Sequence, residues 1–158
     1  MTGSQDLKSF DMTKDLHLSQ LHSPYNNELN EDFCNRWVSI TAIRKLRLGR
    51  SRDKDSAIVV DAQISRYWNT DKEYLYITLA KPAFKKSGQG VSVTLGLLTN
   101  TRLKSIFHFL GDPNLKSREV HNTCERCGIV DCEPRVNPPV KIEESEAEQA
   151  IFSVLEQL

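Results

Sequence analysis

Three of the four cysteines in this chain are Cys124, Cys127 and Cys132, in the stretch "CERCGIVDC". The first spacing, C-x2-C, is that of a zinc knuckle, in which two thiolates bind one tetrahedral ion while backbone amides turn toward the sulfurs. The third thiolate follows five residues later and can reach the same ion across a turn that contains Gly128. The pattern therefore predicts a Cys-rich, metal-type loop near the C-terminus.

A tetrahedral site needs a fourth ligand, and two residues are candidates. Cys34 offers the same soft thiolate, whereas His121 lies three residues before Cys124. Arg126 and Arg135 would offset the charge of several thiolates. Zinc is the metal we expect, with an iron–sulfur cluster as the alternative because it uses the same ligands. Reduced cysteines without an ion are the third interpretation.

Composition and charge limit the class of protein. With 158 residues the chain has the length of one domain, and its 21 basic and 21 acidic side chains cancel. This balance argues against a wholesale binder of nucleic acid or anionic membranes. The N-terminus lacks the apolar core of a signal peptide, and no apolar run reaches the roughly 18 residues that cross a bilayer. We therefore expect a cytoplasmic protein without a membrane partner, in which disulfides are rare.

The elements that would position the cysteine loop can be inferred from hydrophobic periodicity. We expect residues 1–26 to form a flexible tail and a helix to begin near Asn27, because Phe33, Trp37, Ile40 and Leu46 recur at helical spacing. The β-branched run over residues 38–43 favours a strand in the second half of this segment.

Three stretches alternate in the manner of strands: "AIVVDAQISRYW", "EYLYITLAKPAF" and "VSVTLGLL". The short turns "NTDK" and "KKSGQG" join them, which predicts an antiparallel meander. A helix should follow over "TNTRLKSIFHFLG", capped by Thr99 or Asn100. His108 lies in its apolar face and is expected to be a packed core or edge residue.

The C-terminal part predicts an extended linker over "NPPVKIEES", because prolines oppose helix, and then an amphipathic helix. The domains expected are the tail 1–26, a regulatory α+β domain over 27–139 that includes the cysteine loop 121–139, and the helix over 140–158. The fold class is α+β, with a small antiparallel sheet of three or more strands and flanking helices in a sensor-like sandwich.

Two further groups of residues have types that suit ligand binding. Arg44, Arg47 and Arg50 lie in a basic stretch over 44–54 that could bind the phosphates of a coenzyme or of nucleic acid, with a solvated loop as the alternative. Tyr74 and Tyr76 could line a pocket, although cross-strand pairing also explains them.

Catalysis finds little support in the sequence. No H-E-x-x-H motif, no serine in a nucleophile elbow and no carboxylate pair with a partner histidine is present. We expect the chain not to be an enzyme.

Four stretches resemble, in the same order, the C-terminal domain of the short-chain fatty-acyl transcriptional regulators: "FCNRWVSITAI", "YLYITLAKP", "VSVTLGLLTNTRLKSIFHFL" and "CERCGIVDCEPRVNPP". The resemblance covers roughly residues 30 to 139, and the ending C-x2-C-x4-C-x2-R-x3-P-P is its most specific part. Cys34 and Trp37 match an upstream C-P-L-W element, with Asn35 in place of its proline. Leu97 stands where the family often has a cysteine.

This resemblance implies a bacterial regulatory domain that senses a ligand or oligomerises, with a short-chain acyl-coenzyme A or a similar small effector and a homodimer as candidate partners. Members of the family carry a helix-turn-helix and a zinc-peptidase-like domain ahead of this one, and this chain contains neither motif. DNA would be contacted only indirectly. The alternative hypotheses are a redox or iron–sulfur-responsive switch and a nucleic-acid-binding module that uses the basic stretch 44–54.

Overall fold

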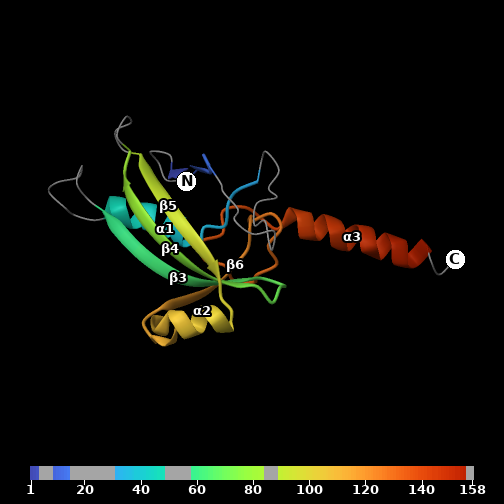
Figure 1. The fold of residues 1–158 in the computed structure, drawn as a ribbon. Helices are drawn as coiled ribbons and strands as arrows, with labels where there is room; N and C mark the ends of the chain where they lie inside the picture. The colour runs from blue at the N-terminus through green and yellow to red at the C-terminus, as the bar shows by residue number, and fades with distance from the viewer. Residues whose placement is uncertain (4–8, 15–30, 49–57, 84–88, 156–158) are drawn as a thin grey trace.

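The computed structural model describes residues 1–3, 9–14, 31–48, 58–83, 89–155, with the side chains of residues 47 and 48 excepted. A single mixed sheet organises this part of the chain, with the strand order β2-β1-β5-β4-β3-β6 (Figure 1). The strands are β1 (Thr2–Gly3), β2 (Phe10–Asp11), β3 (Val59–Tyr67), β4 (Glu73–Pro82), β5 (Gly90–Leu98) and β6 (Lys116–Val120). The α+β class is thereby confirmed.

The centre of the sheet is the expected antiparallel meander. β4 pairs with β3 on one side and with β5 on the other, both antiparallel. Because side chains alternate along a strand, Tyr74, Tyr76 and Thr78 face one side of the sheet, and Leu75 faces the other. The sheet therefore has two faces, one that carries the tyrosines and Thr78 and one that carries Leu75.

Helix α1 (Val38–Leu48) covers the face that carries Thr78 and Ala80. Ile40, Ala42 and Ile43 are fully buried at this contact. The prediction that a helix begins near Asn27 is wrong for the described residues 31–37, which are extended or form a turn. The prediction of a strand over residues 38–43 is also wrong, because the apolar residues of α1 recur at helical spacing and pack on the sheet.

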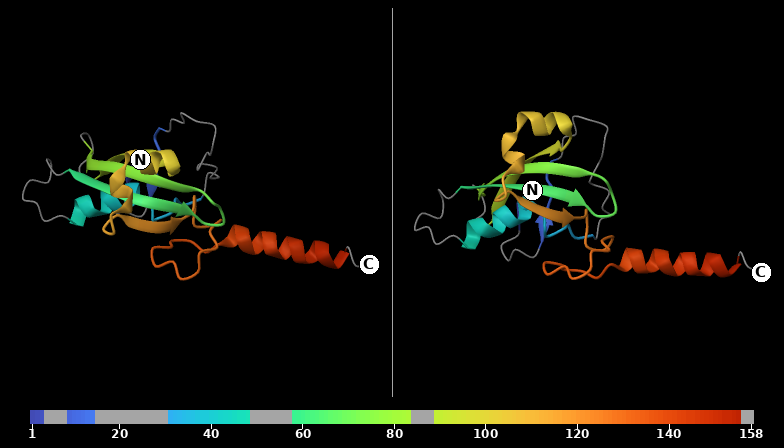
Figure 2. Two further views of the ribbon diagram at one scale, coloured as in Figure 1. Left: turned by 60° about the horizontal axis from the view of Figure 1, so that its bottom comes forward. Right: turned by 90° about the horizontal axis from the view of Figure 1, so that it is seen from below.

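The opposite face receives the short helix α2 (Thr101–Ile106) and the 3-10 helix η1 (His108–Gly111), as the view from below shows (Figure 2). The expected cap is confirmed, since the backbone N–H of Leu103 donates to Asn100 Oδ1 at 2.8 Å. His108 is exposed rather than packed in an apolar face. Leu75 is fully buried on this side of the sheet, whereas Val93 is 76% exposed.

Three strands were not predicted. β6 lies parallel to β3, with Tyr67 opposite Val120, and it leads directly into the cysteine loop. β1 pairs with β5, and β2 pairs with β1. Residues 2–3 and 10–11 therefore belong to the sheet rather than to a tail, and residues 15–30 lie outside the described part.

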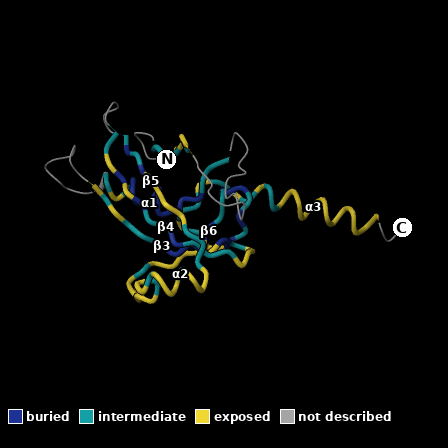
Figure 3. The backbone as a smooth tube through the Cα atoms, in the orientation of Figure 1, coloured by how far each residue is buried: buried dark blue, intermediate teal, exposed yellow. Residues whose placement is uncertain are grey.

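The expected C-terminal helix is α3 (Val140–Leu155). It begins directly after Pro139, so the predicted extended linker ends earlier than expected, in accord with the tolerance for proline at a helix start. The helix extends away from the body, and none of its residues is buried (Figures 1 and 3). No helix in the described ranges is both long and apolar enough to cross a membrane.

The parallel strand β6 should contribute measurably to stability through Val120, whose side chain is fully buried beside Cys34, Trp37 and Tyr67. Val120→Ala removes two buried methyl groups and leaves a cavity, so the free energy of unfolding should fall by about 2 kcal/mol. Val130 is 80% exposed, and Val130→Ala is the matched control. Chemical denaturation measures both; equal effects of the two substitutions would contradict the burial of β6.

Candidate metal centre and adjoining cavity

The cysteine loop is held against the body by a short antiparallel pairing. The backbone N–H of Cys34 donates to Asn122 O, and the N–H of Cys124 donates to Asp32 O, each at 3.0 Å. Phe33 and Thr123 form the β-bridge between these two bonds. Cys34 and Cys124 are thus diagonal neighbours on paired segments, a relation that places Cα atoms about 7–8 Å apart. We call residues 31–37 and 119–125 together the clasp.

The four thiols are all reduced and differ in their burial. Cys34, Cys124 and Cys127 are buried, Cys132 is partly exposed, and none forms a disulfide. The pKa of the Cys34 thiol is raised to about 11, mainly by burial and in smaller part by the charges that Cys124 and Cys127 would carry. Burial also raises the pKa of Cys127, to which Cys132 and Cys124 add in the same sense. A thiolate at position 124 would therefore disfavour ionisation of both Cys34 and Cys127.

Backbone amides turn toward two of the sulfurs, as a metal knuckle requires. The N–H groups of His121 and Arg36 hydrogen-bond to the Cys34 thiol and lower its pKa, against the larger effect of burial. The N–H of Ile129 does the same for Cys127. In both turns one donor lies two residues after the cysteine. Such donors stabilise a thiolate and limit its charge.

The ready-made ligand set that the spacing predicted is not formed. Within the described ranges, no group of three or more His, Cys, Asp or Glu side chains is arranged to hold a metal ion. The His121 ring packs edge-on against Trp68, with ring centroids 5.8 Å apart. Burial lowers the pKa of His121, and its Nδ1 is buried without a hydrogen-bond partner among the described residues. The backbone N–H of His121 is directed at the Cys34 thiol, whereas its ring packs against Trp68.

Arg135 organises the loop from inside. Its guanidinium donates to the carbonyl oxygens of Cys124 and Cys127 at 2.9 Å each and of Ile129 at 2.8 Å. A charged planar donor suits three converging carbonyls, and such bonds are stronger than neutral ones. The sequence suggested Arg135 as a counter-charge for thiolates. Its charge lowers the pKa of Cys127, and its hydrogen bonds go to the backbone that carries the sulfurs.

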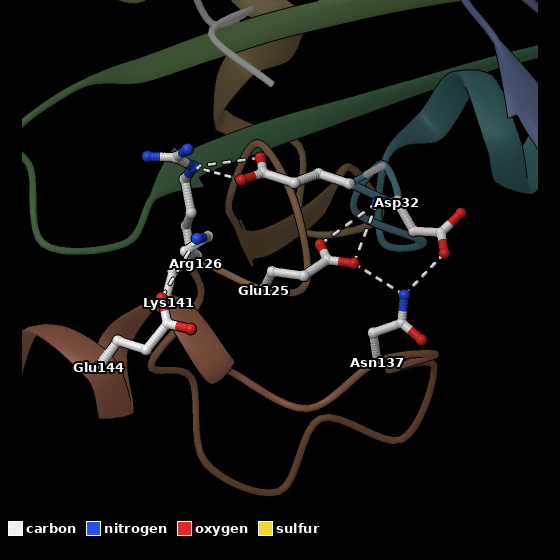
Figure 4. A network of polar contacts seen from close by, with 7 residues as sticks. Asp32, Glu125, Arg126, Asn137, Lys141 and Glu144 are labelled. Carbon is white, nitrogen blue, oxygen red and sulfur yellow. Dashed lines mark hydrogen bonds and ion pairs between the residues drawn. The ribbon is translucent and has the colours of Figure 1, made fainter. Parts of the chain in front are cut away.

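The buried residue Glu125 joins the loop to Asp32 through its carboxylate (Figure 4) and to α3 through its backbone carbonyl. Both oxygens of Glu125 lie 3.2 Å from the backbone N–H of Asp32, and Asn137 Nδ2 donates to Glu125 and to Asp32, at 2.7 Å each. The Glu125 carbonyl accepts from the N–H of Lys141 at 3.0 Å. Nearby, Arg126 Nε lies 2.8 Å from Glu31 Oε1. These contacts had no signal in the sequence beyond the unusual density of charge around the cysteines.

A cavity of about 500 Å³ opens beside the clasp, between the N-terminal strands, the start of α1 and the meander. Its lining is mainly apolar and includes Met1, Met12, Trp37 and Val38. The hydroxyls of Tyr67 and Tyr76, both in the lining, lie 3.0 Å apart. Ser92 Oγ is buried in the same wall and has no hydrogen-bond partner among the described residues. An apolar space with few polar groups is typical of a small-molecule site.

Trp37 connects the cavity to the cysteine loop. Its indole N–H donates to the carbonyl of His121 at 2.9 Å, and its ring packs in the cluster that contains Cys34 and Val120. The same residue forms part of the cavity wall. Trp37 therefore contacts both the cavity and the cysteine loop.

The residues expected to bind a ligand divide into three groups. Tyr76 lines the cavity, whereas Tyr74 packs edge-on against Tyr67, with centroids 5.8 Å apart, and is not in the lining. Arg44 donates to Asn35 Oδ1 at 3.0 Å, and its guanidinium lies 5.4 Å from the centroid of the Phe10 ring, which gives it a structural role. The side chain of Arg47, and Arg50 with most of the basic stretch, lie outside the described part.

Comparison with protein-family models, with curated proteins and with solved structures finds no match for this chain.

Removing the Arg135 guanidinium should loosen the loop. Arg135→Ala leaves three carbonyls without their charged donor, so the free energy of unfolding should fall by about 3 kcal/mol. Arg118 is exposed on β6, and Arg118→Ala should change stability by less than about 0.5 kcal/mol. Denaturant titration followed by circular dichroism compares the two, and a near-neutral Arg135→Ala would contradict the assigned role.

Proposed function

We propose that this chain is a non-enzymatic, ligand-sensing regulatory domain of a bacterial transcriptional regulator, with a structural zinc bound by cysteines. The observation that supports it best is the clasp, which brings Cys34 beside the cysteine loop and places Trp37 in the wall of a cavity. The motif that resembles the fatty-acyl regulators is built on these same residues.

The donor set fits zinc in its chemistry. Cys34, Cys124, Cys127 and Cys132 would be the ligands, because three are buried, all are reduced, and two already accept amide hydrogen bonds. His121 is the weaker candidate, since its ring is packed against Trp68. Zinc would supply a covalent junction between the clasp and a loop that otherwise depends on Arg135 and Glu125.

The cavity would hold the effector, and Trp37 would report its presence. A ligand against the indole changes the packing of a side chain whose N–H is bonded to His121 O in the clasp. The loop passes this change to the base of α3 through the bond from Lys141 N–H to Glu125 O. An apolar acyl chain suits the lining, and the tyrosine hydroxyls and Ser92 suit a polar end group.

The metal hypothesis predicts about one zinc per chain in protein purified without chelator, by elemental analysis. Cys34→Ser should remove most of the zinc, because serine is a poor zinc ligand. His121→Ala should keep it, because the histidine ring is directed elsewhere.

Circular dichroism of the same samples checks that both variants fold. A folded, metal-free wild-type protein would contradict the hypothesis. Iron with inorganic sulfide in place of zinc would instead support the iron–sulfur alternative.

The sensing hypothesis predicts saturable binding of short-chain acyl-coenzyme A thioesters or of the corresponding acids, measured by calorimetry. Tyr76→Phe removes a cavity hydroxyl without changing the shape of the ring, so the Kd should rise about tenfold. Tyr74→Phe is the matched control and should change the Kd by less than about twofold, because Tyr74 is not in the cavity lining. Equal effects of the two substitutions would place the ligand elsewhere.

A further inference from the structure

A row of large apolar side chains is exposed on the sheet face opposite α1. Val60 pairs with Leu79, and Leu79 pairs with Val93, so the three lie side by side across β3, β4 and β5. Leu95 follows on the same side of β5. Their exposed fractions are 68%, 40%, 76% and 54% in this order. We call Val60, Leu79, Val93 and Leu95 the sheet patch.

Helix α3 carries a second exposed apolar surface. Ile151, Phe152, Val154 and Leu155 are each 58–65% exposed, and none of the residues of α3 is buried. Ile151, Val154 and Leu155 share one side of the helix, because residues three and four apart are neighbours. A stripe of this kind is normally packed against another element, because most helical stability in proteins comes from the packing of an amphipathic face.

The two surfaces of one chain do not meet. The first turn of α3 is fixed to the loop, because the N–H of Lys141 donates to Glu125 O, and a Cβ at Gly128 would lie 3.2 Å from the Ile142 side chain. From this base the helix runs away from the sheet in all three views (Figures 1 and 2). Only a second molecule can bring an α3 to the sheet patch without breaking the helix or its base.

Charge favours the sheet patch over a second α3 as the surface on which α3 docks. The first three turns of α3 contain Glu143, Glu144, Glu146 and Glu148 against one basic residue, Lys141. On the patch side of the sheet, α2 presents exposed Arg102 and Lys104. Two α3 helices in contact would instead bring glutamates together, or set them over apolar residues.

We propose that α3 of one copy docks on the sheet patch of a second copy, and that the exchange is reciprocal in a two-fold dimer. The helix is about 24 Å long, which matches a sheet whose central strands have nine or ten residues at about 3.3 Å each. Each copy offers eight large apolar side chains for the centre of the interface, and the charged residues around them would form its rim. The dimer does not depend on zinc or on an effector.

Sedimentation equilibrium of the full chain from about 1 to 200 µM should give a monomer–dimer equilibrium. Two double variants test the two surfaces: Ile151→Glu with Val154→Glu in α3, and Leu79→Lys with Val93→Lys in the sheet patch. All four residues are exposed, so the fold should persist, and each variant should raise the dimer Kd about tenfold or more. Val130→Glu, on neither surface, should leave the Kd unchanged.

The decisive measurement mixes the two double variants. Native mass spectrometry should show the mixed dimer, because it keeps one intact contact between a wild-type α3 and a wild-type sheet patch, while each variant alone stays monomeric. A wild-type protein that is monomeric throughout would overturn the proposal. A sheet variant that dimerises as the wild type does would point to pairing through α3 alone and would also overturn it.

Discussion

The clasp is the interaction on which the rest of the structure depends. Two backbone bonds, Cys34 N–H to Asn122 O and Cys124 N–H to Asp32 O, join segments about ninety residues apart in the chain. The parallel strand β6 enters the clasp on one side, and α1 leaves it on the other. Without this pairing the cysteine loop would have no fixed position relative to the sheet, and Trp37 would lose the carbonyl that orients it.

Polar contacts hold the loop where apolar contacts are few. Arg135 binds three carbonyls, and Glu125 binds the N–H of Asp32 and the side chain of Asn137. Partly buried networks of this kind are sensitive to the loss of any member, because each lost partner leaves a desolvated group behind. The position of the loop between the cavity wall and the base of α3 therefore depends on a few polar side chains, and substitution of any of them should be poorly tolerated.

Sequence periodicity predicted the elements that depend on local pattern. The meander, the helix capped by Asn100 and the C-terminal helix have strong alternation or capping signals, and the structure contains all three. The helix capped by Asn100 is shorter than predicted, since it ends at Ile106 and a separate 3-10 helix spans His108–Gly111. The start of α1 was placed too early, because Phe33 pairs with Thr123 and this long-range bridge overrides helical spacing. β1, β2 and β6 were missed, since strands of two to five residues have little pattern of their own. The roles of Arg135 and Glu125 follow from tertiary geometry, which spacing does not encode.

The central claim is that cysteines from both halves of the clasp share one zinc ion. X-ray absorption at the zinc edge, on protein loaded with one equivalent, tests it most directly. The account predicts a first shell of four sulfur scatterers at about 2.3 Å, three from the loop and one from Cys34. A shell dominated by nitrogen and oxygen at about 2.0 Å would contradict it.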